Sequence, residues 1–334
     1  MDEAPKLDRY NMRGFLEAFP GQFEKGLEIS RNVRVDGDFY GMLLCGVGGS
    51  ALPGELLIDY LGAETQIKIN RDYSLPGSID SDTLVFVSSY SGNTEEALSA
   101  YEQARNRGLK VIGFCSGGKL EELCKAHGTP FVKYPKERHG FQPRFALGYA
   151  FASMCRVLYN CGLINDETER IMECAKSLRG LKPESGAMEI AKRMKGKIPL
   201  IYTSERFSSL GYIIKIKFNE NSKIMAFCNR FPEMNHNEII GHTNSGRQAR
   251  FHTVMLKEAG DHQRTRERME ITGSLIKSCG GDVTNIELRG DDMLTKMFSA
   301  LCLFDWVSYF LALEYSTDPT PVDMVEKLKK ELKA

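Results

Sequence analysis

Two segments of this chain repeat one order: an apolar run of strand length, a turn rich in glycine and hydroxyl residues, and a helical pattern. Apolar residues 40–45 lead into the turn Cys-Gly-Val-Gly-Gly-Ser at 45–50, and apolar residues 84–87 lead into Ser-Ser-Tyr-Ser-Gly-Asn-Thr-Glu-Glu at 88–96. A strand that passes directly into a helix favours a parallel sheet, because parallel neighbours need a crossover connection. The feature therefore points to an α/β fold.

The same alternation continues along the chain and predicts two doubly wound α/β domains, each with a mainly parallel sheet flanked by helices. We expect them to span residues 1–162 and 163–334, with the polar stretch 165–197 as a connector that contains helix. Strands are expected at 40–45, 65–70, 84–88, 110–115 and 130–134, then at 198–203, 223–227, 251–257 and 283–288. Helices are expected at 52–61, 95–106, 120–126, 145–161, 208–220, 262–279 and 293–313. Asn93 and Glu96 have the spacing of a capping box at the start of the helix 95–106.

Both turns offer what a phosphate needs. A helix begins after each, and its unpaired backbone amides and positive dipole end favour an anion. Glycine allows close backbone approach, and hydroxyls donate to phosphate oxygens. The candidate binding residues are Gly49, Ser50, Ser89, Ser91 and Thr94. No lysine lies in either turn, so neither is a nucleotide P-loop.

Two other interpretations of the first turn stay open. Residues 46–51 fit the dinucleotide fingerprint G-x-G-x-x-[G/A], for which Asp72 is the nearest candidate for the ribose-binding acid. The turn is also compatible with a strand-to-helix connection that binds nothing. The second hydroxyl cluster favours a small phosphoester, because a dinucleotide site does not require it.

Composition excludes several classes of protein. The chain has 44 basic and 44 acidic residues, which gives no electrostatic case for nucleic acid or an anionic membrane as partner. The N-terminus lacks the order of a signal peptide. The longest apolar stretch, 301–313, is interrupted by Asp305 and is expected to be a buried helix, too short to span a bilayer. We expect a cytoplasmic protein.

The nine cysteines show neither a C-x-x-C motif nor zinc-ligand spacing, so no metal centre is expected. Their scatter through apolar runs suits buried, reduced thiols, although one or two disulfides remain compatible with the pattern.

Candidate chemistry outside the turns centres on three residues. Glu220 lies near the end of an apolar helix, His236 follows in Asn-His-Asn-Glu, and Arg144 precedes another apolar helix. Glu220 is a candidate base and His236 its acid–base partner. Alternatively, Glu220 caps the helix or pairs with a lysine such as Lys217, and His236 is a polar residue in a solvated loop. A cation is disfavoured at a helix N-terminus, so Arg144 holds an anion or forms an ordinary ion pair. His139 and His242 are expected in surface or loop positions.

Taken together, these motifs resemble the sugar isomerase (SIS) domain family, specifically the bifunctional phosphoglucose/phosphomannose isomerases of archaea and bacteria. The matching segments run in family order from about residue 40 to the C-terminus. They are Gly48-Gly49-Ser50, residues 89–94, Pro143-Arg144, residues 218–221, residues 235–238, and the C-terminal stretch 318–329.

The resemblance implies an aldose–ketose isomerase that interconverts glucose 6-phosphate and mannose 6-phosphate with fructose 6-phosphate, without metal or cofactor. Gly49, Ser50, Ser89, Ser91 and Thr94 would bind the phosphate. Glu220 would move the proton between C1 and C2, Arg144 would stabilise the enediolate, and His236 with Lys329 would assist ring opening. Lys327 is the alternative to Lys329. The resemblance also implies a homodimer; a non-catalytic sugar-phosphate regulator and an amino-sugar phosphate isomerase are the alternative functions.

Overall fold

The computed structural model describes residues 4–62 and 65–332, and contacts between Cα atoms divide the chain into two compact units. The N-terminal unit comprises residues 17–180, and the C-terminal unit comprises residues 181–334 together with the first sixteen residues. This division differs from the expected domains 1–162 and 163–334. The helix α8 (Thr168–Arg179) packs against α3 (Gly21–Ile29), and Arg179 forms an ion pair with Glu24, so the first unit extends beyond residue 162.

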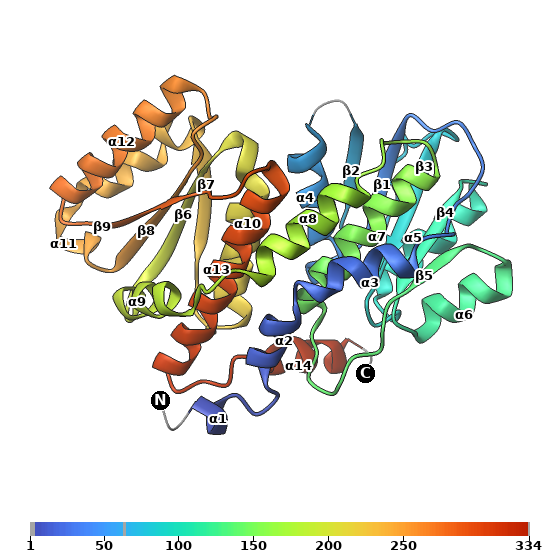
Figure 1. The fold of residues 1–334 in the computed structure, drawn as a ribbon, viewed down its shortest axis with the longest axis horizontal. Coiled ribbons are helices and arrows are strands. Elements are labelled where there is room, and N and C mark those ends of the chain that lie inside the picture. Colours follow the sequence, from blue (N-terminus) through green and yellow to red (C-terminus); the bar gives the residue numbers. More distant parts are fainter. Residues whose placement is uncertain (1–3, 63–64, 333–334) are drawn as a thin grey trace. The chain divides into compact units, whose positions relative to one another are not determined.

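The N-terminal unit is built on a five-stranded parallel sheet in the order β2-β1-β3-β4-β5 (Figure 1). The strands are β1 (Gly41–Cys45), β2 (Gln66–Asn70), β3 (Thr83–Ser88), β4 (Val111–Cys115) and β5 (Phe131–Lys133). The helices are α2 (Met12–Ala18), which crosses the boundary between the units, α3, α4 (Leu52–Leu61), α5 (Glu95–Asn106), α6 (Gly118–His127), α7 (Leu147–Asn160) and α8. The expected α/β fold and the expected strands of this half are confirmed.

Side-chain alternation places helices on both faces of this sheet. Leu43, Val85 and Val87 pack in one cluster with Ala97 and Tyr101 of α5. The neighbouring residues of the same strands face the opposite side of the sheet. Leu44 of β1, for example, contacts Gly54 of α4 on that side. Strands buried on both faces need continuous apolar runs, which is why these strands were predictable from the sequence.

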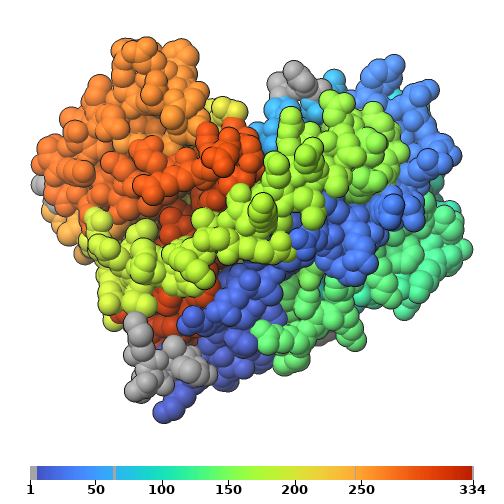
Figure 2. Space-filling model, in the orientation of Figure 1, coloured from blue at the N-terminus to red at the C-terminus, as the bar shows by residue number. Residues whose placement is uncertain are grey.

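The C-terminal unit has a four-stranded parallel sheet in the order β7-β6-β8-β9. Its strands are β6 (Ile198–Ser204), β7 (Phe227–Phe231), β8 (Phe251–Lys257) and β9 (Asp282–Glu287). The helices are α1 (Ala4–Leu7), α9 (Glu184–Met194), α10 (Ser208–Glu220), α11 (Ser245–Gln248), α12 (Gln263–Ser278), α13 (Met293–Glu314) and α14 (Asp323–Glu331). Helix α12 covers one sheet face, where Met269 and Ile276 pack with Tyr202 of β6, and its orange residues form much of the visible surface of this unit (Figure 2).

The apolar helix α13 passes through the C-terminal unit. In the described part of the chain, one helix is long and apolar enough to cross a membrane, namely α13 with 22 residues. Its length exceeds the run 301–313, so the expectation that it is too short to span does not hold. About 67% of the most apolar 18-residue stretch of this helix is buried inside the structure, as in the core helix of a soluble protein.

Two local predictions were wrong. The strand expected at 223–227 begins only at Phe227, because α10 ends at Glu220 and Lys223 then adopts a left-handed conformation with φ of +58°. The capping box at Asn93 does not form either. Thr94 is the N-cap residue of α5, and the Asn93 side chain instead accepts a hydrogen bond from the Lys119 amide.

A buried histidine on the second sheet makes stability depend on pH. His252 on β8 is fully buried, with Nδ1 3.2 Å from Asp282 Oδ2 on β9 and Nε2 2.8 Å from the Thr284 hydroxyl. Lys197 and Arg193 also bind Asp282. Burial outweighs the attraction of Asp282 and lowers the pKa of His252 from its ordinary 6.5 to about 4.

We therefore expect the C-terminal unit to lose stability as the pH falls from about 6.5 towards 4, because the unfolded chain binds a proton there and the folded chain does not. At pH 5 the loss from His252 alone is about 2 kcal/mol. Urea midpoints measured between pH 4.5 and 7.5 check this. In His252→Gln, the urea midpoint should change less with pH over this interval than in the wild type. In the exposed control His139→Gln, it should change as in the wild type. The same pH dependence in all three proteins would contradict the assignment.

Candidate active site

The two predicted phosphate loops meet where the strand order of the first sheet reverses. From β1 the chain crosses to β2 on one side, and from β3 it crosses towards β4 on the other. The loops after β1 and β3 therefore diverge at the carboxyl edge of neighbouring strands, where open α/β sheets bind their ligands. The first loop contains the short 3-10 turn η1 (Gly48–Ser50) and leads into α4, and the second leads into α5.

Hydroxyl groups connect the two loops. The Tyr90 amide donates a hydrogen bond to Ser50 Oγ at 3.1 Å. Within the second loop, the Ser89 and Thr94 hydroxyls lie 2.8 Å apart, and the Asn93 amide donates to Ser91 Oγ. Ser89 is fully buried beneath the loop, whereas Ser50 and Thr94 are half-buried and Ser91 is exposed. The predicted phosphate-binding hydroxyls of this unit are thus assembled at one edge of the sheet.

A third segment closes against the first loop and brings Arg144 to it. Arg144 belongs to the 3-10 turn η3 (Pro143–Phe145), which directly precedes α7. A Cβ atom at Gly49 would lie 2.8 Å from the Arg144 amide nitrogen and 2.9 Å from the Pro143 carbonyl carbon, so only glycine permits this approach. Arg144 is 5% exposed, and its guanidinium lies over the Phe145 ring. The backbone of a residue with a buried cationic side chain therefore adjoins a loop that offers amides and hydroxyls to an anion.

Gln22 fixes the junction between η3 and α7. Its side chain, 3% exposed, donates to the Phe145 carbonyl at 2.7 Å and accepts from the Gly148 amide at 3.1 Å. No local pattern pointed to this residue, because its partners lie more than 120 positions away. The second loop is held as tightly: Gly92 has φ of +72°, and a Cβ there would lie 1.8 Å from the Gly117 carbonyl oxygen.

The predicted base Glu220 lies at the C-terminal end of α10 and is half-buried. Lys217, the lysine named as an alternative partner for Glu220, binds Asp305 of α13 at 2.5 Å, and both residues are buried. Removing one partner of such a pair leaves a buried charge uncompensated, at a cost of about 3–5 kcal/mol. This end of α10 is therefore firmly fixed to α13.

His236 lies in the 3-10 turn η5 (Glu233–His236) and is exposed. The next turn, η6 (Glu238–Thr243), is anchored beneath it by a polar network. The Tyr202 hydroxyl donates to Glu238 Oε1 at 2.7 Å and lies 2.9 Å from His242 Nε2. Burial, followed by the hydrogen bond to Glu238, raises the pKa of Tyr202. His242 and His139 were expected in surface or loop positions: His242 lies in the turn η6 but is buried, at 6% exposed, whereas His139 is exposed.

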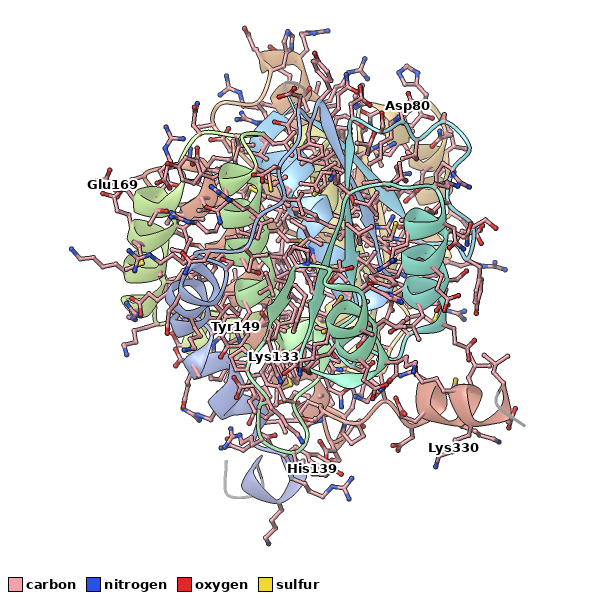
Figure 3. All side chains as sticks on the ribbon, turned by 90° about the vertical axis from the view of Figure 1, so that its right-hand side faces the viewer. Asp80, Lys133, His139, Tyr149, Glu169 and Lys330 are labelled. Carbon is pink, nitrogen blue, oxygen red and sulfur yellow. The ribbon has the colours of Figure 1, made fainter. Side chains whose placement is uncertain are left out.

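The C-terminal lysines lie on α14, none of whose residues is buried. Lys329 forms an ion pair with Glu326 at 2.8 Å, and Lys327 lies 3.8 Å from Glu331. The neighbouring Lys330 extends its side chain into solvent (Figure 3). Both candidate lysines are exposed, and the choice between Lys329 and Lys327 stays a prediction. Glu220, His236 and Lys329 thus come from three separate elements of the C-terminal unit.

The equivalent edge of the second sheet has the opposite electrostatics. The strand order reverses between β6 and β8. Ser204 is the last residue of β6, and the loop after β8 contributes Glu258 and Asp261. Ser204 Oγ donates to Asp261 Oδ1 at 2.8 Å, and Lys296 pairs with Glu258. Burial raises the pKa of Asp261. Two carboxyl groups stand where the first sheet has hydroxyls, so this edge disfavours a phosphate.

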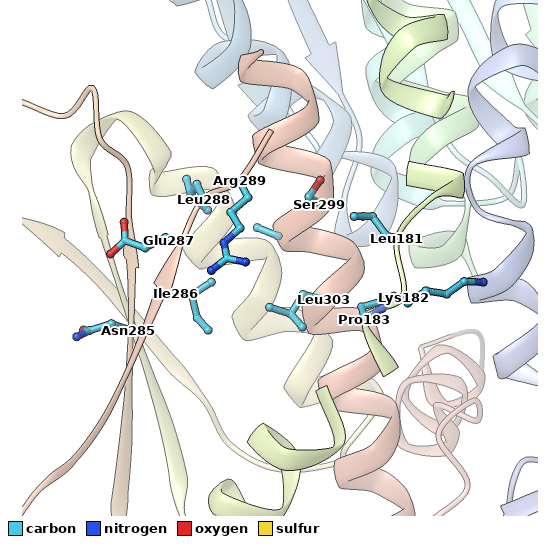
Figure 4. A pocket seen from close by; sticks show the side chains of 11 residues that line it. Leu181, Lys182, Pro183, Asn285, Ile286, Glu287, Leu288, Arg289, Ser299 and Leu303 are labelled. Carbon is cyan, nitrogen blue, oxygen red and sulfur yellow. The ribbon is translucent and has the colours of Figure 1, made fainter. Parts of the chain in front are cut away.

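Two cavities in the C-terminal unit contain none of the predicted site residues. One, of about 310 Å³, lies between β9, α13 and the start of α9, and Leu181, Leu288 and Leu303 point into it (Figure 4). The other, of about 410 Å³, is lined by Glu258, Glu267, Glu270 and Glu287 beside Lys257 and Arg266, among others. The first is mainly apolar and the second mainly acidic, so neither suits a sugar phosphate.

The contact between Gly49 and Arg144 can be tested directly. Gly49→Ala should weaken binding of a hexose phosphate by about tenfold or more, because the added methyl group pushes the first loop away from the Arg144 backbone. Gly77→Ala is the matched control, since a Cβ there meets nothing within 4 Å. Calorimetric titration gives the dissociation constants; equal affinities in the two variants would show that the close approach does not serve binding.

Known proteins are similar to this chain in sequence and in fold. The family model for the bacterial phospho-glucose isomerase C-terminal SIS domain matches residues 184–332. A bifunctional phosphoglucose/phosphomannose isomerase of Caldicellulosiruptor bescii is 40% identical, with 94% of this chain and 96% of that protein covered. A D-glucosamine-6-phosphate 4-epimerase of Sulfolobus acidocaldarius is 35% identical over 58% of this chain and 61% of its own length.

Among solved structures, a hypothetical protein of Thermus thermophilus has the same fold, with a TM-score of 0.77 at 16% identity over 100% of this chain and 94% of its own. The full-length identity to the Caldicellulosiruptor bescii protein, together with two parallel sheets of the SIS type, settles the family. The chain belongs to the bifunctional phosphoglucose/phosphomannose isomerases and is a sugar-phosphate isomerase with two SIS-type units.

Proposed function

We propose that this isomerase interconverts glucose 6-phosphate and mannose 6-phosphate with fructose 6-phosphate through a cis-enediolate, without a metal ion. The observation that carries the proposal is the meeting of Arg144 with the hydroxyl-bearing loops at the edge of the first sheet. The names of the full-length relatives supply the substrate class.

In this proposal the phosphate is held by the loops at Gly49–Ser50 and Ser89–Thr94, with Ser91 reaching it from the exposed side. Binding the phosphate far from the reacting carbons positions C1 and C2. Glucose 6-phosphate and mannose 6-phosphate differ only at C2, which becomes planar in the enediolate. One base therefore serves both substrates.

The chemical steps are assigned to four side chains. His236 and Lys329 assist opening of the sugar ring, and Glu220 removes the proton from C2 and returns it to C1. Arg144 stabilises the oxyanion that develops during the transfer, as a fixed cation in a partly desolvated site can. Its burial beside the phosphate loop supports this assignment. These residues need no cofactor for the proton transfer.

A homodimer, which the family resemblance implies, and a cytoplasmic location, which the scatter of the cysteines through apolar runs favours, belong to the same proposal. Light scattering of the purified protein gives the oligomeric state.

A substrate assay decides between the functions that the family includes. We expect turnover of both glucose 6-phosphate and mannose 6-phosphate to fructose 6-phosphate, with rates unchanged by a chelator. Loss of all activity in the chelator would overturn the metal-free mechanism, and turnover of one aldose alone would remove the dual assignment. The partial identity to the glucosamine-6-phosphate epimerase makes an amino-sugar phosphate the second candidate substrate, so glucosamine 6-phosphate belongs in the same assay.

Glu220→Gln tests the base. We expect kcat to fall by about 10²- to 10⁴-fold, the usual contribution of a general base, while the protein stays folded and still binds fructose 6-phosphate. Glu189→Gln, an exposed carboxylate on α9 of the same unit, is the control. A near-normal kcat in Glu220→Gln would remove Glu220 from the mechanism. Binding without turnover in the wild type would instead favour a non-catalytic regulator.

A further inference from the structure

Lys223 has a backbone conformation that is unusual for its residue type. It follows the end of α10 with φ of +58°, in the left-handed region where glycine ordinarily ends a helix. In the described residues, Asn11 and Ser316 are the other non-glycine residues with positive φ, and both have short polar side chains. A long side chain at a strained position suggests that the side chain has a task.

The Lys223 ammonium binds three backbone carbonyls. It donates to Glu220 O at 2.5 Å, to Asn221 O at 3.3 Å and to Pro319 O at 3.0 Å. The first two belong to the end of α10, where carbonyls lack helical partners and a cation is favoured. The third belongs to the segment between α13 and α14. One side chain therefore ties the backbone of Glu220 to a segment almost one hundred residues later.

That segment has a second attachment in the same unit. Asp318 accepts hydrogen bonds from Arg9 Nε at 2.8 Å and from the Thr320 amide at 3.0 Å. The segment leads directly into α14, in which no residue is buried. The starting position of α14, and with it the position of Lys329, consequently depends on how this segment is held.

We propose that Lys223 is a positioning residue that keeps the Glu220 end of α10 in register with the segment that carries α14. The inference rests on the proposed function, because Glu220 and Lys329 are its base and its ring-opening lysine. A helix cap would need only the carbonyls of Glu220 and Asn221. The bond to Pro319 is the contact that a cap does not require, and it links two groups that act on one substrate.

Lys223→Gly separates this role from a structural one. Glycine adopts the same φ without strain, and this relief offsets the loss of the ammonium's hydrogen bonds, so the melting temperature should change little. The relative position of Glu220 and Lys329 is then no longer fixed, so kcat with glucose 6-phosphate should fall by about tenfold or more. KM should change by less than about twofold, because the phosphate loops are untouched. Lys223→Arg retains donors for the carbonyls and should recover part of kcat.

Ser316→Gly is the matched control, since it also relieves a left-handed residue next to the same segment, and its kcat should equal that of the wild type. A Lys223→Gly protein with wild-type kcat would overturn the inference while leaving the proposed function intact. A parallel drop of kcat and melting temperature would make Lys223 structural and would also overturn it. An inactive wild type would overturn the proposed function, and this inference with it.

Discussion

The reversal of strand order between β1 and β3 is the constraint on which the candidate site depends. All strands of the first sheet are parallel, so their carboxyl ends lie at one edge. The helices that follow β1 and β3 cross back on opposite faces of the sheet. The loops after these two strands therefore turn away from each other at this edge, and each leads into the start of a helix. Ser50 and Thr94 reach the same place for this reason, although 44 residues separate them in the sequence.

The close approach of Gly49 to the Pro143–Arg144 backbone adds a charge to this edge. Amides and hydroxyls can hold a phosphate, but the developing charge of an enediolate needs a fixed cation. Arg144 is buried and stays beside the loop because Gln22 ties its turn to α7. Its unfavourable position before a helix is therefore compatible with a role in binding an anion.

The second sheet repeats the topology and changes the chemistry. Its strand order also reverses, between β6 and β8, yet Glu258 and Asp261 stand at that edge. Their charge disfavours the anion that the first edge suits. In the proposed function this unit instead contributes Glu220, His236 and Lys329, which lie at the end of a helix, in a turn and on the C-terminal helix. One fold thus supports two tasks, since side chains rather than topology decide what an edge binds.

The elements that were predictable are those with strong local signals. Continuous apolar runs bounded by turn residues identified β1, β3 and β4. Helical periodicity identified α5, α7 and α13 to within two residues at most ends. The start of β7 was predicted too early because a lysine, not a glycine, occupies the left-handed position at 223, so the sequence gives no signal of the turn there. The Lys217–Asp305 pair and the burial of His242 were not predicted. Each depends on a partner that is distant in the sequence, Asp305 for Lys217 and Tyr202 for His242.

The sequence by itself determined the α/β class and the two hydroxyl-bearing loops, because each leaves a signal within a few neighbouring residues. The substrate class and the residue roles of the proposed chemistry came from the motifs that follow the order of the family along the chain. Only the tertiary structure decided that Arg144 adjoins Gly49, that carboxylates occupy the second edge, and that Lys223 joins the end of α10 to the segment before α14. Those facts rest on contacts between distant segments, which no local pattern specifies.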